Sequence, residues 1–522
     1  QLDEVMVSAN LQKKADRWVF YPSDAIKRQS TDAYDVLQRM ALPDLQFDLM
    51  NRTLSSQKGG ALQIRINGVP SKQSDLAALQ PQDIARVEYI DNPGIVYGDG
   101  VAAALLVHTK RGYEGMQGGV QIAHALTTKQ GNAYAYLKIV GQKHQLAITI
   151  DRLYKSVGGV FNNSDKTLRY PANELTLNTK GDDKAYRYRN SSVKLEYNKL
   201  LDERNSFFNI MANYATSRQP ENVSQSHAQS NGAPFFSEAL LTRDRTHNAS
   251  LDFYLDKQFA SKANLLANLT ATYIGSDYRR AYSKAYHAAA QPAFSNAYDV
   301  DGKHKSIIGE VIFKQPLSKQ LNLTIGTHNR LSKTNNTYVA TNTTTPTSLL
   351  NFNNYDYVEL SGMLGKLAYS VGGGYSFYRT KNDSLMANYH FFRPSLALSY
   401  SLSKAFRLQY YLGINPVEPQ LAMLSTFVQT QSEYELRKGN PHLKPYQAYI
   451  NQLSLSFRKH ETTASIATYI QYNRHPFTNN PPTYDAAANM FVYTQANQHS
   501  FTHFQVRLNA SQSLFSQAFK LF

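Results

Sequence analysis

From about Gly112 to its end, this sequence is dominated by short runs in which apolar and polar residues alternate. Alternation with a period of two places apolar side chains on one face of an extended strand and polar side chains on the other. The pattern therefore predicts half-buried antiparallel β-strands throughout residues 113–522. The clearest runs cover residues 133–139, 145–151, 192–197, 208–214, 249–255, 265–273 and 453–457.

The connections between these runs alternate between short and long along the chain. A transmembrane barrel has this property because its periplasmic turns are short and its outer loops are long. A water-soluble sandwich has no reason to put every long loop at one end. We therefore expect a mainly β protein, a transmembrane antiparallel β-barrel with short turns near residues 141–144, 201–205, 258–262, 315–320, 402–405 and 459–462, and long loops near residues 155–190, 217–245, 276–304, 334–354 and 415–445.

Residues 11–112 contain both helical and strand periodicities, which predicts a small mixed α/β domain. Val36, Leu37 and Met40 fall on one helical face, and Thr31 or Asp32 is a suitable N-cap for that helix. The other expected elements are an alternating strand at 62–66 that ends in the hairpin signal Asn67-Gly68, a short helix at 74–79, and strands at 84–90 and 104–109.

The composition agrees with a barrel and excludes several other classes. The chain has 36 Tyr and 25 Phe but one Trp, which suits strands whose ends carry aromatic girdles. No stretch approaches the roughly 18 to 20 uninterrupted apolar residues of a membrane-spanning helix, so a helical membrane protein is excluded. Cysteine is absent, which excludes disulfides and thiolate metal sites.

The formal net charge of +16 comes from 55 Lys and Arg against 39 Asp and Glu. Nucleic acid is not expected as a partner, because the basic residues are scattered through candidate loops and alternate with acidic ones. A rim that faces lipopolysaccharide explains the charge, and steering of an anionic substrate is the second interpretation. The basic residues of the first long loop are Lys166, Arg169, Lys180, Lys184, Arg187 and Arg189.

No arrangement of catalytic or metal-binding residues stands out. The 14 His include no HExxH pair, and they fall on different connections. No Ser/His/Asp arrangement, phosphate-binding glycine loop or carboxylate pair is supported by position. We expect no enzyme activity, no metal site and no cofactor.

A recurrent turn sequence bears on how complete the barrel is. Pro316–Leu323, Ser401–Leu408 and Ser513–Leu521 resemble one another. If the third copy is also a periplasmic turn, the chain stops a few residues into a rising strand, after about sixteen complete strands. Closure of a barrel pairs the first strand with the last, so we expect C-terminal strands that this sequence does not contain.

An ordered series of motifs in the first 112 residues resembles the plug of the TonB-dependent outer-membrane receptors. The resemblance implies a barrel of about 22 strands in the cell outer membrane, formed here by residues 113–522 without its C-terminal strands and occluded by a plug at residues 11–112. The matching stretches are 35–37, 66–70, 79–90, 92–94, 97–98 and 106–110, together with Gly439–Pro445, which resembles the family's GNPxLxP entry to a strand.

Residues 1–10 resemble the segment that opens such plugs and often holds the TonB box. An extended alternating segment pairs with the edge of a periplasmic partner and can then be pulled. A flexible terminus or a first plug strand is an equally open interpretation. The residues expected to couple to a TonB-type energy-transducing protein are Asp3, Glu4, Val5, Met6 and Val7.

Two charged residues of the plug are expected to contact the barrel. Arg86 and Glu88 share one face of a predicted strand, and in the resembling family such charges help to hold the plug against the barrel wall. The alternative is an ordinary exposed strand face with a salt bridge.

Ligand capture is expected in the plug loops and outer loops that would face outward. Loops 51–60 and 71–75 carry cations suited to an anionic or hydroxyl-rich ligand, and tyrosines of loop 276–304 could stack on a sugar, a haem or a chelate. Solvated turns and aromatic-girdle positions are the alternative interpretations. The candidate residues are Arg52, Lys58, Lys72, Tyr278 and Tyr282.

The function that the resemblance implies is TonB-dependent active import of a scarce substrate, of the siderophore, vitamin, peptide or glycan class, across the outer membrane. The main alternative is a non-transporting structural subunit of an outer-membrane protein complex, and a barrel lipase or protease is a third interpretation. The implied partners are a periplasmic TonB-type protein, outer-membrane lipid and lipopolysaccharide, and a lid lipoprotein or other outer-membrane subunits.

Overall fold

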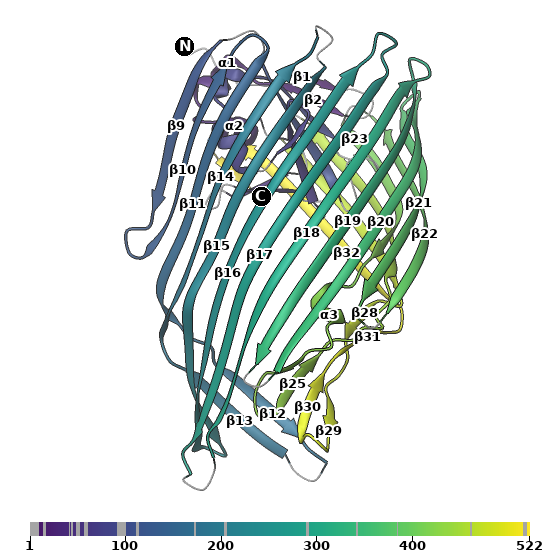
Figure 1. Cartoon of the computed structure of the whole chain (residues 1–522). Helices are drawn as coiled ribbons and strands as arrows, with labels where there is room; N and C mark the ends of the chain where they lie inside the picture. The colour runs from purple at the N-terminus through teal and green to yellow at the C-terminus, as the bar shows by residue number, and fades with distance from the viewer. Residues whose placement is uncertain are drawn as a thin grey trace.

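Two β-sheets of very different size dominate the chain (Figure 1). None of the described helices is long or apolar enough to cross a membrane. The computed structural model describes residues 10–13, 17–40, 42, 45–48, 53–56, 61–71, 73–90, 101–110, 114–171, 174–202, 206–288, 292–340, 343–383, 385–403, 405–459, 462–514 and 519–521.

The N-terminal sheet has the strand order β1-β2-β7-β8-β5-β6. β5 and β8 pair in parallel, and the other neighbours pair antiparallel. Asn67 and Gly68 join β5 to β6 with φ angles of 52° and 91°, as the hairpin signal predicts. The strands are β1 (Asn10–Lys13), β2 (Trp18–Tyr21), β5 (Ala61–Ile66), β6 (Val69–Ser71), β7 (Ile84–Ile90) and β8 (Val101–Thr109), with a separate hairpin of β3 (Leu45–Asp48) and β4 (Thr53–Ser56).

Short helices share the core of this sheet. α2 begins after Asp32, whose side chain accepts a hydrogen bond from the Asp35 N–H. Val36 and Leu37 are fully buried in one cluster with Val87 of β7, which confirms the helical face predicted from the sequence. The second predicted helix is a 3-10 helix, η1. The helices are α1 (Asp24–Arg28), α2 (Ala33–Arg39), η1 (Gln73–Ala78) and η2 (Pro81–Asp83).

The large sheet is antiparallel and curls into a barrel (Figure 1). Its order runs from β9 and β10 through β32 to β33, and β33 is the neighbour of β9. Sixteen of its nineteen strands in the described part of the chain have ten or more residues, in agreement with the strand count expected from the sequence. The larger count that the resemblance implies, and the further C-terminal strands, stay predictions.

The barrel strands are β9 (Gly115–His124), β10 (Lys129–Val140), β11 (His144–Val160), β14 (Lys184–Leu200), β15 (Phe207–Ser230), β16 (Ala233–Gln258), β17 (Asn264–Tyr286), β18 (Phe294–Pro316), β19 (Leu321–Ala340), β20 (Thr343–Leu364), β21 (Leu367–Asn382), β22 (Met386–Ser401), β23 (Phe406–Val417), β26 (Tyr446–Lys459), β27 (Thr462–Arg474), β32 (Phe501–Leu514) and β33 (Phe519–Leu521), with β12 (Ser164–Arg169) and β13 (Glu174–Gly181) as a hairpin between β11 and β14. The remaining elements are α3 (Leu421–Leu424), β24 (Val428–Thr430), β25 (Glu435–Lys438), β28 (Phe477–Asn479), β29 (Thr483–Asp485), β30 (Met490–Tyr493) and β31 (Gln495–Asn497).

Large apolar side chains remain exposed on the outer face of the barrel. Leu195, Ile210, Leu251, Leu269 and Ile307 are 38–56% exposed, although their strands are paired on both sides. A soluble monomer rarely leaves so extensive an apolar surface in water, whereas lipid covers it in a transmembrane barrel. The outer face is therefore the lipid-facing one, and the opposite side of each strand lines the lumen.

Several barrel strands continue far beyond the membrane. β15 and β16 have 24 and 26 residues, whereas crossing a bilayer takes about 9–11. The expectation of a long loop at 217–245 is wrong, because these strands stay paired until the two-residue turn at Asn231 and Gly232. Strands likewise fill most of 276–304 and 334–354, since hydrogen bonds between strands suffice where both faces meet water.

The N-terminal sheet lies inside the barrel, at the end with the short turns (Figure 1). Gln80 donates a hydrogen bond of 2.8 Å to the hydroxyl of Tyr136 on β10. From the opposite part of the ring, the Arg407 guanidinium on β23 lies 5.3 Å from the centre of the Trp18 ring. Strands β11 to β22 separate these two wall positions, so the compact N-terminal sheet and its short helices reach both only from within the lumen.

Candidate functional site

Polar contacts join the N-terminal sheet and its short helices to the barrel wall among the residues that the structure describes. Gln117 of β9 donates to the Asp83 carboxylate at 2.9 Å, and Lys194 of β14 pairs with Asp75. Contacts of this kind are directional but bury little apolar surface, unlike the interior of the N-terminal sheet itself. The apolar core of the N-terminal sheet therefore stabilises it more strongly than these polar contacts attach it to the barrel wall.

Arg86 and Glu88, which were expected to contact the barrel wall, pair with each other at 2.8 Å. Arg17 of the same sheet lies 2.7 Å from the other Glu88 oxygen, and His108 lies 3.3 Å away. Burial alone would raise the pKa of Glu88, but hydrogen bonds from His108, Arg17 and Arg86 outweigh it and hold that pKa well below its usual range. All these partners belong to the N-terminal part of the chain, and Glu88 is 5% exposed, so the salt bridge lies on a buried strand face and not on the exposed one of the alternative interpretation. A contact of Arg86 or Glu88 with the barrel wall stays a prediction.

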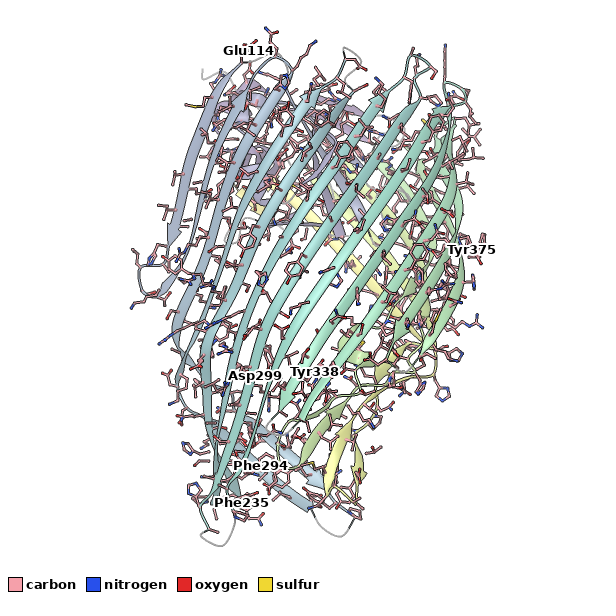
Figure 2. The ribbon with its side chains drawn as sticks, in the orientation of Figure 1. Glu114, Phe235, Phe294, Asp299, Tyr338 and Tyr375 are labelled. Atoms are coloured by element: carbon pink, nitrogen blue, oxygen red, sulfur yellow. The ribbon has the colours of Figure 1, made fainter. Side chains whose placement is uncertain are left out.

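At the opposite end of the barrel, two long loops form a small sheet that we call the outer cap. It consists of β24, β25, β30 and β29 in that order. Glu114 marks the short-turn end in Figure 2, and Phe235 and Phe294 mark the outer end. The cap lies beside β12 and β13 at that outer end (Figure 1), on the far side of the lumen from the N-terminal sheet.

Lys284 of β17 fastens the outer cap to the barrel wall. Its side chain is 1% exposed and lies 3.0 Å from the Glu433 carboxylate. The Lys284 ammonium also lies 3.9 Å from the centre of the Phe236 ring and 4.0 Å from that of Tyr434. Aromatic rings and a carboxylate together compensate a buried ammonium for the water it has lost. The loop segment at 433–434 is thus tied to wall strands β16 and β17.

Arg280, four residues earlier on β17, holds the same loop by binding its backbone. Its guanidinium donates to the carbonyl oxygens of Thr430 at 3.3 Å and Gln431 at 2.7 Å. Phe427 stacks on Tyr338 of β19, with ring centres 4.3 Å apart. These contacts anchor both sides of β24.

Two more ion pairs connect the cap to its surroundings. The Arg330 guanidinium of β19 lies 3.0 Å from the Glu418 carboxylate at the start of the loop. Lys166 of β12 lies 2.6 Å from Glu435 of β25, which also accepts a hydrogen bond from Tyr493 at 2.6 Å. Burial raises the pKa of Glu435, but the hydrogen bonds from Lys166 and Tyr493 outweigh this and leave the pKa lowered. Glu435 is therefore ionised at neutral pH and joins three outer segments.

Tyr278 and Tyr282, which were predicted to bind a ligand, lie where the outer cap meets the barrel wall. Tyr282 is 6% exposed and donates a hydrogen bond of 2.6 Å to Glu238 of β16, and Tyr278 packs with Tyr298 beside Phe427. Tyr282 is therefore buried, whereas Tyr278 is partly exposed. The other predicted site residues lie outside the described residues: Asp3, Glu4, Val5, Met6, Val7, Arg52, Lys58 and Lys72.

Lys284, Arg280 and Phe427 are not among the residues singled out from the sequence. The sequence contains one pattern that indicates a strand here. Every second position carries an aromatic or basic residue: Tyr278, Arg280, Tyr282, Lys284 and Tyr286. Because 276–304 was interpreted as a loop, this strand pattern was not recognised. Among the described residues, no group of three or more His, Asp or Glu is arranged to hold a metal ion.

The family of the chain follows from comparison with known proteins. The model of a family described as "Outer membrane protein beta-barrel family" matches residues 257–520, just over half of the sequence. The chain belongs to this family and is a protein of the cell outer membrane. A search of curated proteins returned no match.

Solved structures of outer-membrane receptors have a similar fold. The ferric enterobactin receptor from Pseudomonas aeruginosa is 13% identical, with 97% of this chain and 80% of that chain covered and a TM-score of 0.58. The copper transporter OprC is 12% identical (98% and 78% covered, TM-score 0.57). The ferric yersiniabactin uptake receptor from Yersinia pestis is 13% identical (97% and 76% covered, TM-score 0.53). The resemblance to TonB-dependent receptors is thereby confirmed at the level of the fold.

Proposed function

We propose that this protein actively imports a scarce substrate across the outer membrane, driven by a periplasmic TonB-type protein. The observation that carries the proposal is the compact N-terminal sheet inside the barrel, in contact with opposite walls. A barrel of sixteen or more strands leaves a wide aqueous lumen, so an internal body of this kind serves to close it. Import requires that the closed lumen open again, and a TonB-type protein would supply the energy for that opening.

The weak point for a mechanical pull is the edge of the N-terminal sheet. Among the residues that the structure describes, β1 is an edge strand and pairs with the four-residue β2 alone. Residues 1–10 resemble the segment that often holds the TonB box, and a pull on that segment would load this edge first. The polar wall contacts of Asp75, Gln80 and Asp83 can break and re-form in a hydrated lumen at small net cost. The sheet would then shift or partly open while its apolar core stays intact.

The similar structures support this direction of function. They are receptors or transporters for ferric enterobactin, copper and ferric yersiniabactin. For this chain we propose import without a particular substrate, which would belong to the siderophore, vitamin, peptide or glycan class. The substrate would enter when the outer cap moves. A lid lipoprotein over the outer end would fit the same scheme.

Deletion of residues 1–10 tests the proposal. The variant should reach the outer membrane in normal amounts, lose binding to the periplasmic domain of the host's TonB-type protein, and lose uptake of the labelled nutrient that the full chain imports. A barrel enzyme would instead act on its substrate without any energising partner. Uptake that is unchanged by the deletion would contradict the proposal, and stable co-purification with another outer-membrane protein, without uptake, would favour the structural-subunit alternative.

A further inference from the structure

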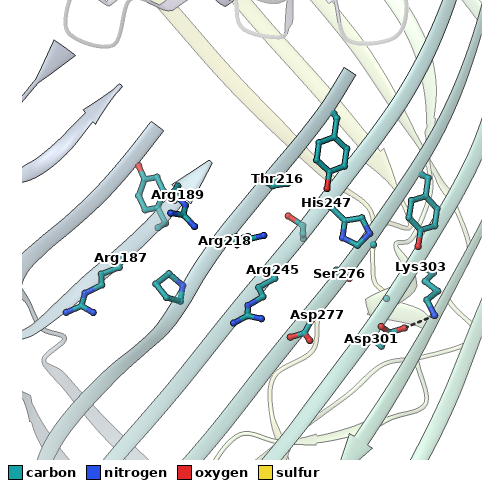
Figure 3. Close-up of a pocket in the computed structure, with 17 residues that line it drawn as sticks. Arg187, Arg189, Thr216, Arg218, Arg245, His247, Ser276, Asp277, Asp301 and Lys303 are labelled. Carbon is teal, nitrogen blue, oxygen red and sulfur yellow. Dashed lines mark ion pairs between the residues drawn. The ribbon is translucent and has the colours of Figure 1, made fainter. Parts of the chain in front are cut away.

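A groove of about 690 Å³ lies on the outer wall of the barrel, across strands β14 to β18 (Figure 3). Strand alternation shows which face carries it. Arg189 lies an even number of residues from the lipid-facing Leu195 on β14, and the same holds for Arg218 and Ile210 on β15 and for Arg245 and Leu251 on β16. These three arginines therefore point away from the lumen.

The register of the sheet sets the three arginines in a row. Arg189 is the direct partner of Arg218, and Arg218 is the direct partner of Arg245. Like charges directly opposite each other on paired strands repel. None of the three guanidinium groups makes an ion pair or a hydrogen bond with any described residue. Asp277 of β17 lies directly opposite Arg245, but the row still carries more positive than negative charge.

The acidic residues of the groove do not balance this row. Asp277 is already paired with Arg243 at 2.9 Å, and Asp301 is paired with Lys303 at 3.4 Å. Arg187 adds a fourth exposed guanidinium beside the row (Figure 3). The groove is accordingly complementary to an anion that carries more than one negative charge.

The depth of the groove in the membrane identifies the source of that anion. Tyr214 and Tyr273 line its inner edge, directly after the apolar belt of β15 and β17, where an aromatic girdle marks the membrane interface. Arg218 follows Tyr214 by four residues, which is about 13 Å along a strand and about 10 Å along the membrane normal at barrel tilt. The arginine row therefore lies at the level of the lipid headgroups, on the side of the long outer strands.

We propose that this groove binds the phosphate-bearing headgroup of one lipopolysaccharide molecule of the outer leaflet, with Arg189, Arg218 and Arg245 as its phosphate ligands. Guanidinium groups match phosphate oxygens through paired hydrogen bonds. The acyl chains of the same molecule would lie against the apolar belt below Tyr214. This site does not depend on import, because it needs only the outer-membrane location of the barrel.

The test compares the full chain with a triple variant, R189Q/R218Q/R245Q, and with a charge-matched control, K143Q/K262Q/K319Q, whose lysines lie on short turns at the other end of the barrel. Each protein is extracted from outer membranes in mild detergent, and bound lipopolysaccharide is counted by native mass spectrometry. Affinity is then measured with purified lipopolysaccharide and with its dephosphorylated form. A second triple variant, R189K/R218K/R245K, keeps the charge and covers the case in which the glutamine variant fails to fold.

We expect one lipopolysaccharide per wild-type chain and per control chain, and an affinity at least about tenfold lower in the glutamine variant and for dephosphorylated lipid. The lysine variant should fall between the two. Equal retention by the glutamine variant, equal affinity for the dephosphorylated form, or displacement of the lipid by millimolar inorganic phosphate would each overturn the proposal.

Discussion

The Lys284 ammonium of barrel strand β17 lies 3.0 Å from the Glu433 carboxylate of the outer cap. This pair joins a wall strand to a loop far away in the sequence, and the rings of Phe236 and Tyr434 surround the ammonium. The pair makes one of the contacts that hold the cap depend on a buried cation.

Replacement of Lys284 by Met should loosen the outer cap without unfolding the barrel. Loss of the cation leaves the Glu433 carboxylate with the Tyr286 hydroxyl but without its ion-pair partner, and it should weaken cap docking by about 2 kcal/mol. Hydrogen exchange of amides 428–438 reports this directly, and it should accelerate about 30-fold. Lys303→Met is the matched control, because Lys303 is exposed and its one ion pair with a described residue is with Asp301 of the same strand. If both variants exchange alike, Lys284 does not fasten the cap.

Gly326 of β19 is required by the ring of Tyr357 on the neighbouring strand. A Cβ at this position would lie 2.3 Å from that ring, and Tyr357 is 5% exposed and packed with its neighbours. Gly326→Ala should destabilise the barrel by about 1–3 kcal/mol through overpacking. Urea unfolding in detergent measures the change. Gly309→Ala on β18, where nothing lies within 4 Å, should be close to neutral, and the reverse ranking would contradict the described packing.

Glu88→Gln should destabilise the N-terminal sheet. The substitution removes the negative charge that Arg17 and Arg86 share, and breaking a buried pair from one side costs about 3 kcal/mol. Amides of β7 should exchange faster in the full-length variant, while barrel amides should not. Glu174→Gln, which breaks the exposed pair with Arg169, should leave exchange unchanged.

The lowered pKa of Glu88 also predicts how this sheet responds to acid. A carboxyl whose pKa is lower in the folded state contributes stability above its unfolded pKa, and the contribution disappears as the pH falls through the folded pKa. The ordinary value is 4.5 and the folded value lies far below it. Protection of β7 amides by this group should therefore be constant from pH 7 down to about pH 5 and decline below pH 4.5. A decline between pH 7 and pH 5 that Glu88→Gln abolishes would contradict this assignment.

Alternation along the chain predicted the membrane-crossing strands and the short turns, because lipid on one face and water on the other impose a strict period of two. It failed at 217–245, where Pro220, Asn231 and a series of Gln and Ser residues resemble a loop. Beyond the membrane both faces of a strand are polar, so no alternation distinguishes β15 and β16 from a solvated loop.

The candidate site was harder to predict than the fold, because it depends on contacts between distant segments. Arg189, Arg218 and Arg245 become neighbours only through strand register, and no local pattern reveals that row. The approach of Glu433 to Lys284 likewise depends on the fold of two outer loops. Arg86 and Glu88 were predicted to share a strand face, which is confirmed, but their pairing with Arg17 was not foreseen.

The proposed import function depends on the N-terminal sheet occupying the barrel lumen. The most direct test is whether this sheet contacts opposite walls of the barrel at the same time. The chain has no cysteine, so the pairs D83C/Q117C and W18C/R407C can be joined by a short bifunctional thiol reagent without background. Both pairs should cross-link in intact outer membranes, and the mismatched pair D83C/R407C should not. Cross-linking at one wall only, or at neither, would show that the sheet does not occupy the lumen and would contradict the proposed import function.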